Sequence, residues 1–468
     1  MKKTLRKMIA LFCAIAMMFT CVACGSGNSV NTGKEGKTAT ATPTKAESTP
    51  TETPATPTET PATPTPTEKQ ATPTPEQGKN PSGSRELTAG SSGQPAETKE
   101  MDEVMRKAYE TFAYQMFRTT TSGETRMISP FSIYTALAML ANGADGNTLA
   151  QIDKLLGLTD TERNAYLAAW IAALTSKQTE AVKFTNADSL WIRKDREQYV
   201  PTTFLNTCAQ YYKAAVFSAL MNDETVQDVN NWVDQNTMGM IKELVKELSP
   251  DNVMILLNAI ALDAKWASPF AEARIVEDYD FTKADGTKQK VEMMFDDMTY
   301  GYLENESATG FIKSYEGGAF SYVALLPKEG VSIEALIDSL QPGVLRNLCL
   351  NAESGDITIG LPKYKTEYEV ILTDALMSLG MTDAFDDDLA DLSRLFEGIH
   401  TNVSKVVHKT FISVDDKGTK AAAVTGIFVD EATCVMPGTP YRVILDRPFV
   451  YVIVDSEGLP IFMGTYEG

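Results

Sequence analysis

Apolar residues recur at helical spacing at the start of the globular part of the chain, between Asp102 and Phe117. Positions three or four apart lie on one face of an α-helix, so this repeat predicts a helix with one buried face. Asp102 precedes the first apolar position, and Asp is a favoured N-cap residue. We therefore expect a helix over Asp102–Phe117. Its apolar face is formed by Met105, Ala108, Tyr109, Phe112 and Met116.

Two further segments have helical patterns of different kinds. Ser129–Asn142 is apolar on nearly every side, which is typical of a helix that is buried all round, and Gly143 is a natural stop signal. Thr148–Leu156 is amphipathic, with one apolar face, and Gly157 follows it. The sequence thus predicts a fully buried helix followed by a half-buried one.

Later segments change to the patterns of β-strands. The C-terminal stretch Arg447–Tyr466 consists of two apolar runs on either side of Ser456-Glu457-Gly458, which predicts a hairpin in a buried sheet. Helices that come first and strands that cluster late indicate an α+β fold. Further strands are expected at Ser321–Leu326, Ile357–Leu361 and Phe411–Val414.

Composition separates a linker from a domain. Residues 24–100 are mainly Thr, Pro, Ala, Ser, Gly and Glu, and cannot bury enough apolar surface to fold. The motif ETPATPT occurs twice in tandem, at Glu52–Thr58 and Glu59–Thr65, and proline at this density favours extended polyproline geometry. We expect a disordered, semi-rigid spacer whose threonines are open to O-glycosylation. One large domain should follow at residues 101–468.

Residues 1–23 have the pattern of a secretory signal peptide. Four basic residues precede an apolar stretch that is too short for a good membrane span. The stretch ends in CVACG, which resembles a bacterial lipoprotein signal in which Cys24 becomes the lipidated first residue, although Cys21 stands where that signal usually has Leu. The protein is therefore expected to be extracellular and tethered to the cell membrane by lipid on Cys24. The alternative is ordinary cleavage and release, which would make it a secreted protein.

Charge and cysteine content argue against several classes of protein. The formal net charge is -20, and no cluster of Lys or Arg marks a nucleic-acid partner. Cys24, Cys208, Cys349 and Cys434 remain after processing. If Cys24 carries lipid, the other three cannot all pair, so no disulfide framework is expected. Cys208 and Cys349 are best explained as small apolar core residues.

The motifs of common enzymes are missing from the sequence. It has two histidines and no HExxH, CxxC, GxSxG or phosphate-binding Gly loop. A metal centre, a cofactor site and a conventional hydrolase triad therefore lack support. His408 remains a candidate only for a triad that assembles in space. We expect a protein that is not an enzyme and needs no cofactor.

The stretch Asp415–Gly426, DDKGTKAAAVTG, has an ambiguous local pattern. Its Ala-rich run favours a helix, whereas Thr, Val and the two bracketing glycines favour a strand or a bend. Taken alone, the stretch fits a buried turn of helix as well as an extended segment.

A resemblance to a known family resolves this ambiguity. Met127–Leu158, MISPFSIYTALAMLANGADGNTLAQIDKLLGL, is similar to the characteristic helices of the serpins, and further blocks follow in the family's order. Together they span essentially all of residues 101–468, so the chain is identified as a member of the serpins. The other blocks are Ala187–Trp191, Val229–Ile241, Leu256–Phe270, Ala324–Gly330, Leu361–Val370, Ser378–Phe385, Val407–Ala423 and Asp446–Gly464.

The resemblance implies a serpin-like fold, with helices packed around large mixed β-sheets and an exposed reactive-centre loop. In serpins, which are a known example of strand addition, this loop becomes a new central strand of the main sheet after cleavage. Residues 415–426 then correspond to the loop hinge, in which Gly418 is expected to act as a flexible pivot. The hinge residues implied are Gly418, Thr419, Ala421, Ala422 and Ala423.

The order of side chains along the hinge fits this role. In a strand, Thr419, Ala421, Ala423 and Thr425 would enter the core side together, and all four are small and uncharged. Lys420 would lie on the opposite side, where its ammonium group reaches water. Because a bulky or charged side chain at position 419 would obstruct entry, the pattern favours an inhibitor over a non-inhibitory relative.

The resemblance also implies roles under the sheet and in the loop. Trp266 matches the breach, where the loop first enters the main sheet. Counting from Gly418 by the family's usual spacing places the reactive bond at Ala432-Thr433, with Glu431-Ala432 and Thr433-Cys434 as the neighbouring alternatives. The residues that match the shutter, a polar network under the opening sheet, are Ser129, Ser132, Asn258 and His408.

The function implied is inhibition of a serine protease, or of a cysteine protease, by suicide-substrate trapping. The protease cleaves the loop, forms an acyl-enzyme and is displaced by loop insertion before water can release it. A small residue before the cut suits the shallow pockets of elastase-like or subtilisin-like enzymes. The expected partners are such a protease and a membrane reached through the lipid anchor, and the protein should be a monomer. The alternative is a non-inhibitory binding or structural lipoprotein of the same fold.

Overall fold

The computed structural model describes residues 83–91, 96–120, 125–419 and 441–468. All of these residues belong to one compact unit of the chain, which lies within Pro73–Gly468. The predicted signal peptide, Cys24 and most of the predicted linker lie outside the described ranges. Outside them also lie the predicted loop residues Ala421, Ala422, Ala423, Ala432 and Thr433, together with Cys434.

The first predicted helix is confirmed, with its cap. α2 spans Glu103–Thr119. The Asp102 carboxylate accepts hydrogen bonds from the backbone N–H groups of Val104 and Met105, two of the donors that a helix start leaves unpaired. The buried face includes four of the five apolar positions that the spacing predicts: Met105, Tyr109, Phe112 and Met116.

The two helices that follow are confirmed as well. α3 spans Pro130–Ala141, and every one of its residues is buried, as the apolar character on all sides predicts. α4 spans Gly146–Leu156 and ends at Gly157. Gly157 adopts a left-handed φ of 81°, which a residue with a Cβ would enter only with strain.

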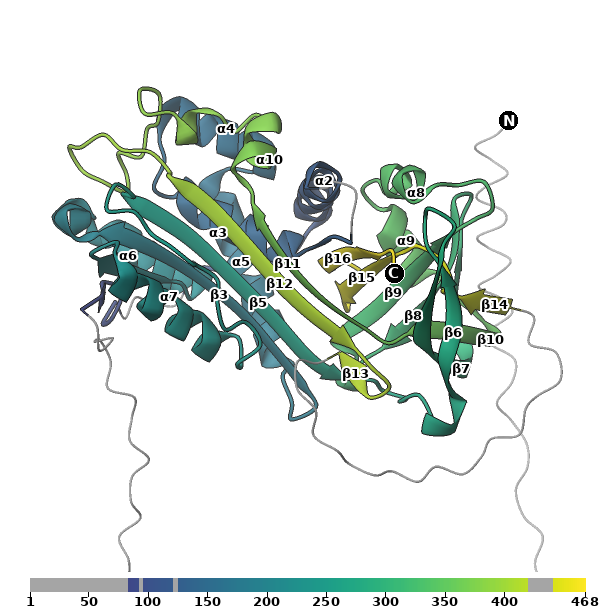
Figure 1. The fold of residues 1–468 in the computed structure, drawn as a ribbon. Coiled ribbons are helices and arrows are strands. Elements are labelled where there is room, and N and C mark those ends of the chain that lie inside the picture. The colour runs from purple at the N-terminus through teal and green to yellow at the C-terminus, as the bar shows by residue number, and fades with distance from the viewer. Residues whose placement is uncertain (1–82, 92–95, 121–124, 420–440) are drawn as a thin grey trace, which may run out of the picture. The chain divides into compact units, whose positions relative to one another are not determined.

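Seven strands of the described residues form the main sheet (Figure 1), in the order β1, β4, β3, β5, β13, β12 and β11. β1 lies inside the range 24–100 that composition assigns to the linker, and it pairs antiparallel with β4. The last part of that range is therefore ordered against the domain. The strands are β1 Arg85–Glu86, β4 Ala215–Ala219, β3 Val182–Arg193, β5 Met254–Lys265, β13 Gly418–Thr419, β12 Lys405–Val414 and β11 Tyr364–Ile371.

Hydrophobic alternation indicates strands only in the later part of the chain, but the two longest strands of the main sheet, β3 and β5, lie near its middle. Ten of the twelve residues of β5 are buried, in an almost unbroken run. A strand that is covered on both faces loses the alternation of apolar and polar residues by which strands are recognised. The late clustering of strands is therefore wrong in detail, although the α+β class holds.

The second sheet contains nine strands of the described residues. Its order is β14, β10, β7, β8, β9, β15, β16 and β2, and β6 pairs with β7 off this path. The predicted strands of this region and the C-terminal hairpin are confirmed. The strands are β14 Tyr441–Ile444, β10 Glu353–Pro362, β7 Lys288–Glu304, β8 Ala308–Ser314, β9 Phe320–Pro327, β15 Phe449–Asp455, β16 Pro460–Tyr466, β2 Met127–Ile128 and β6 Ile275–Thr282.

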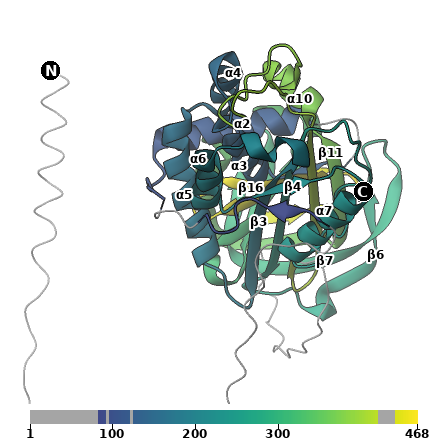
Figure 2. The same ribbon diagram turned by 90° about the vertical axis from the view of Figure 1, so that its left-hand side faces the viewer.

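The main sheet is covered on both faces (Figure 2), by α3 on one side and by α7, Asp223–Asn236, on the other. Along β5, Leu256 and Ile260 pack in the cluster that includes α3. Leu257 and Ala259 point the opposite way and pack in the cluster that includes α7. α3 also contacts β16, so it lies between the two sheets. Any separation of the strands of the main sheet must therefore disturb packing on both faces.

Five α-helices of the described residues remain, and four of them are only six or seven residues long. Within the described ranges, no helix combines the length and the apolar character needed to cross a bilayer. The α-helices not yet mentioned are α5 Asp160–Ser176, α6 Thr202–Thr207, α8 Ile333–Ser339, α9 Val344–Leu350 and α10 Thr373–Ser378. Short 3-10 or π helices span Lys194–Tyr199, Cys208–Tyr212, Glu272–Arg274, Glu316–Gly318 and Asp383–Phe385.

Candidate functional site

β5 and β12 meet at the centre of the main sheet, and we call the boundary between them the seam. The seam is closed at one end, where the two strands pair, and parted at the other, where they separate. At the closed end, residues 405–409 of β12 pair in parallel with residues 255–259 of β5. At the parted end, the short strand β13 lies between them (Figure 1). Thr419 of β13 pairs antiparallel with Ala264 on one side and with Val414 on the other. The chain that follows β12 thus turns back and begins a new central strand.

Gly418 is required here by a close approach of two backbones. A Cβ at this position would lie 2.1 Å from the carbonyl oxygen of Ala264 and 2.8 Å from the Cα of Lys265, and neither backbone atom can move easily. The φ of Gly418 does not lie in the left-handed region. Gly418 is therefore held in a strand here, and its lack of a side chain allows the contact with β5. Its role as a flexible pivot stays a prediction.

Thr419 and the predicted breach residue Trp266 both contact Tyr315. The Thr419 side chain is buried, and its hydroxyl is hydrogen-bonded to the hydroxyl of Tyr315. The rings of Tyr315 and Trp266 are stacked, with centroids 4.6 Å apart and an angle of 7° between the planes. The sequence reasoning missed Tyr315, because no local pattern connects it with a residue 104 positions further along the chain.

The turn before β13 is anchored by Trp266 and by its own first aspartate. The indole N–H of Trp266 donates to the carbonyl oxygen of Asp415 at 2.8 Å, and its backbone N–H donates to that of Lys417 at 2.9 Å. The Asp415 carboxylate accepts hydrogen bonds from the backbone N–H groups of Lys417 and Gly418, at 2.8 and 3.0 Å. An aspartate that bonds to the backbone two and three residues ahead stabilises a tight turn.

Asp416 of this turn forms an ion pair with Lys363, at 2.9 Å. Glu292 lies on the same ammonium group, at 3.3 Å. Partial burial works against the charged form of Lys363, but the two carboxylates outweigh it and raise the pKa of Lys363 above its usual value. The ion pair therefore ties the turn to the start of β11. Lys363 lies inside a block that resembles the serpins, yet nothing in the sequence alone indicates its partner.

The four predicted shutter residues come together beneath the closed end of the seam. Asn258 of β5 and His408 of β12 are paired in register, so their side chains leave the sheet on the same face. The backbone N–H of Ser129 donates to Nε2 of His408 at 3.0 Å, and the Ser129 hydroxyl donates to the carbonyl oxygen of Ile461 at 2.7 Å. Ser132 donates its backbone N–H to the Ser129 hydroxyl.

Asp188 completes this cluster and was not anticipated. It lies opposite Asn258 on the neighbouring strand β3. Its carboxylate accepts hydrogen bonds from the side-chain amide groups of Asn258, at 2.5 Å, and of Asn186, at 2.9 Å. A carboxylate buried among amides and hydroxyls is costly unless it is hydrogen-bonded in this way. The cluster thus crosses three neighbouring strands of the main sheet.

Burial perturbs the two titratable groups of the cluster in opposite directions. It lowers the pKa of His408 to about 3, so the imidazole is neutral. Because Nε2 accepts a hydrogen bond, the proton lies on Nδ1, which has no hydrogen-bond partner among the described residues. Burial raises the pKa of Asp188 to about 6 despite its amide and hydroxyl partners. The side-chain oxygens of Asn258 (Oδ1) and Ser132 are likewise unpartnered within the described chain.

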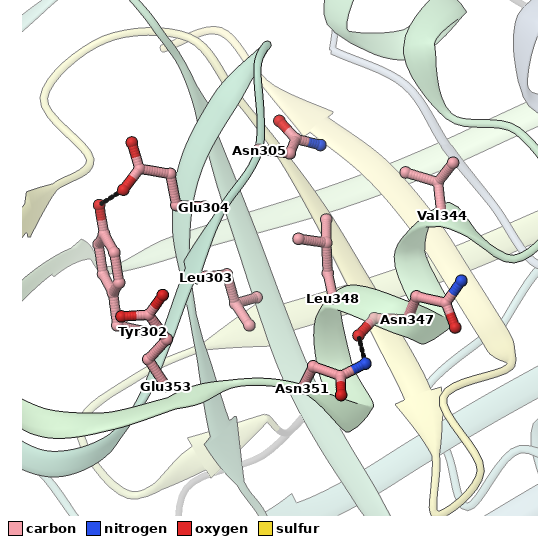
Figure 3. A pocket seen from close by; sticks show the side chains of 9 residues that line it. All are labelled: Tyr302, Leu303, Glu304, Asn305, Val344, Asn347, Leu348, Asn351 and Glu353. Atoms are coloured by element: carbon pink, nitrogen blue, oxygen red, sulfur yellow. Dashed lines mark hydrogen bonds between the residues drawn. The ribbon is translucent and has the colours of Figure 1, made fainter. Parts of the chain in front are cut away.

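A surface pocket of about 330 Å³ lies between the turn that joins β7 to β8 and the helix α9 (Figure 3). Acidic and amide side chains line it, and Tyr302 donates its hydroxyl to Glu304 at 2.9 Å. Tyr302 is also stacked on Tyr441, the first described residue after the loop. None of the predicted hinge, shutter or breach residues lines this pocket. The described residues also contain no cluster of ligands suited to a metal ion.

A seven-stranded main sheet with a chain segment starting a central strand, over a buried polar cluster, is the architecture of a serpin. The family model for serpins, described as serine protease inhibitors, matches residues 107–467. The chain therefore belongs to the serpin family, whose members are generally protease inhibitors rather than enzymes.

Individual relatives agree with this assignment. An uncharacterized serpin-like protein of Thermococcus kodakarensis is 30% identical over 367 residues, which cover 76% of this chain and 84% of the relative. Human neuroserpin is 28% identical, covering 75% of this chain and 88% of the relative. Among solved structures, the thermophilic serpin tengpin in its native state matches with a TM-score of 0.76 and 38% identity, covering 82% of this chain and 99% of tengpin.

Proposed function

We propose that this serpin inhibits serine proteases by trapping them, and that its cleaved loop inserts as a full strand between β5 and β12. The observation that carries the proposal is β13, which already occupies the first positions of that strand. Family membership supports protease inhibition in general. The strand-like hinge supports inhibition by insertion in particular, because a loop that could not enter the sheet would not begin there.

The registers of the two flanking strands support continued insertion. Thr419 is opposite Ala264 of β5 and Val414 of β12. In antiparallel pairing, each step forward along the loop moves one step back along both neighbours. Six steps on, Thr425 would come opposite both Asn258 and His408, which are themselves partners in the closed seam. Both neighbours therefore accept the incoming strand without a slip in register.

The side chains of the incoming strand fit the space offered. Thr419 points into the core, so alternation would send Ala421, Ala423 and Thr425 the same way and Lys420 to the other face. At the closed end, Thr425 would bring a hydroxyl group to the polar cluster beneath the sheet. The cluster contains buried polar atoms without partners among the described residues, and a hydroxyl can both donate and accept.

The balance of hydrogen bonds favours the inserted form. Insertion separates the five residue pairs between β5 and β12. It replaces that one interface with two, because the new strand pairs on both sides. Each backbone hydrogen bond contributes on the order of 1 kcal/mol net. This gain displaces the protease, which is held on the cleaved loop as an acyl-enzyme.

The proposal also specifies the target protease and the location of the protein. The reactive bond at Ala432-Thr433 has a small residue before the cut and no Lys or Arg nearby, which suits elastase-like or subtilisin-like serine proteases. A cysteine protease that forms the same kind of acyl-enzyme is a second possible target. The protein acts outside the cell as a monomer, held at the membrane by lipid on Cys24 through the Thr/Pro-rich spacer.

A panel of proteases tests the proposal. The protein is incubated with a subtilisin, an elastase and, as the mismatched control, a trypsin, and the products are separated under denaturing conditions. We expect a covalent complex with the first two, and mass spectrometry should place the cut at Ala432-Thr433 or one bond away. Clean cleavage of the loop by these enzymes without any complex would overturn the proposal. That outcome would favour a non-inhibitory binding role, since thyroxine-binding globulin, solved with thyroxine, has the same fold at 26% identity and a TM-score of 0.70.

A further inference from the structure

The hydroxyl group of Tyr315 is hydrogen-bonded to a residue of the hinge. Tyr315 follows β8, is completely buried, and is hydrogen-bonded through its hydroxyl to that of Thr419. Its backbone N–H donates to the carbonyl oxygen of Phe320 at 3.1 Å, and it forms an isolated antiparallel bridge with Trp266. Tyr315 is therefore held by the second sheet and by the breach, and does not depend on the hinge for its place.

The Tyr315 ring belongs to a buried cluster of aromatic side chains. Trp266 stacks on one face of this ring, and the indole in turn meets the rings of Phe270 and Tyr322 edge to face, at 6.2 and 5.8 Å. Lys313 of β8 is a buried cation that lies over the Phe270 ring, 4.5 Å from its centroid, and it is paired with Asp296 at 2.8 Å. A buried phenol in such a setting needs a hydrogen-bond partner. Thr419 supplies it, whereas a residue without a hydroxyl would leave the phenol unsatisfied.

We propose that Tyr315 is a positioning residue for loop insertion, which seats the hinge in the main sheet by binding the Thr419 hydroxyl before the loop is cut. The inference rests on the proposed function for its consequence but not for its geometry. Because Thr419 is already paired in the main sheet, the cleaved loop does not have to find its first position there. Insertion then extends a strand that is already in place.

The same hydrogen bond fixes the register of the entering strand. A slip of one residue reverses the faces of every side chain in a strand. It would bring Gly418 or Lys420 to Tyr315, and the first offers no side chain while the second would bury an unpaired charge. The hydroxyl group of Thr419 therefore distinguishes the correct register from either slipped one.

Hydrogen exchange on the intact, uncleaved protein tests the seat directly. Tyr315→Phe removes the hydroxyl and keeps the ring. Tyr322→Phe is the matched control, since Tyr322 is equally buried, also touches Trp266, and bonds to the hydroxyl of Tyr364 instead of the hinge. We expect the backbone amides of residues 415–419 to exchange about fivefold faster in Tyr315→Phe, as loss of one net hydrogen bond implies. They should be unchanged in Tyr322→Phe.

Substitution from the hinge side separates positioning from general stability. Thr419→Val keeps the shape but removes the hydroxyl, and Thr419→Ser keeps the hydroxyl. With a protease that is trapped, we expect Tyr315→Phe and Thr419→Val to consume several times more inhibitor per trapped enzyme. Thr419→Ser should resemble the wild type, and the double variant Tyr315→Phe/Thr419→Val should be no worse than Thr419→Val alone.

Two results would overturn the inference. One is equal exchange of residues 415–419 in the wild type, Tyr315→Phe and Tyr322→Phe. The other is additive loss in the double variant, which would mean that the two hydroxyls act separately. If instead the wild type trapped no protease at all, the proposed function would fail, and the exchange comparison would still decide whether Tyr315 seats the hinge.

Discussion

Replacing Asp188 with Asn is expected to change how stability depends on pH. Asp188 is 1% exposed and His408 is 0% exposed, both beneath the main sheet. Burial raises the pKa of Asp188 from 3.8 to about 6, against hydrogen bonds from Asn258, Thr135 and Asn186. Burial lowers the pKa of His408 from 6.5 to about 3. The nearby thiol of Cys208, whose pKa burial also raises, keeps its proton throughout this range.

The two shifts oppose each other in the free energy of unfolding. Stability from a raised carboxyl pKa is fully present below pH 3.8 and is lost as the pH rises through about 6, which amounts to about 3 kcal/mol for Asp188. Stability from a lowered histidine pKa is fully present above pH 6.5 and is lost as the pH falls through about 3, which amounts to about 5 kcal/mol for His408. Between pH 4 and 6 the two slopes nearly cancel.

Asp188→Asn removes the pH dependence of stability that comes from Asp188 and leaves the one that comes from His408. The variant should lose about 2 kcal/mol of stability, relative to the wild type, when the pH falls from 6 to 4. His408→Gln removes the opposite slope, so its stability relative to the wild type should rise over the same range. The assay is denaturant unfolding of the three proteins at pH 4, 5, 6 and 7. A difference between wild type and Asp188→Asn that stays constant with pH would refute the buried, ionising Asp188 on which the reasoning depends.

Three further predictions concern the loop. Thr419→Arg should turn the inhibitor into a substrate, because a guanidinium cannot enter the buried site of Thr419 unpaired; full inhibition by this variant in a complex-formation assay would contradict insertion. Cleavage near Ala432 without a trapped protease should raise the melting temperature strongly, and calorimetry that finds no change after clean cleavage would count against a new strand. Cys434 should react with a small alkylating reagent well before Cys208 and Cys349, because burial raises the thiol pKa of both, to about 12 for Cys349. If alkylation slows association with a subtilisin-like protease in the wild type but not in Cys434→Ser, the thiol regulates docking; equal rates leave it a bystander.

Local patterns in the sequence were sufficient for several elements of the fold. The Asp102 cap, the all-buried α3 and the stop at Gly157 follow from spacing and backbone preference within one or two turns. The C-terminal hairpin follows from two apolar runs around one turn. The strands β3 and β5 escaped the same method, because burial on two faces removes the alternation that marks a strand. Both strands overlap blocks that resemble the serpins, so the resemblance assigned these segments to the fold although their periodicity did not mark them as strands.

The sequence by itself determined that small, uncharged residues alternate along the hinge, because alternation depends only on the order of residues that are close together in the chain. Only the tertiary structure decided what the hinge meets. Gly418 is needed because β5 passes within contact distance, and Thr419 needs its hydroxyl because Tyr315 is buried opposite it. Asp188 joins the polar cluster beneath the sheet because β3 lies beside β5. Each of these contacts joins residues 70 or more positions apart, and only the order of strands in the sheet brings them together.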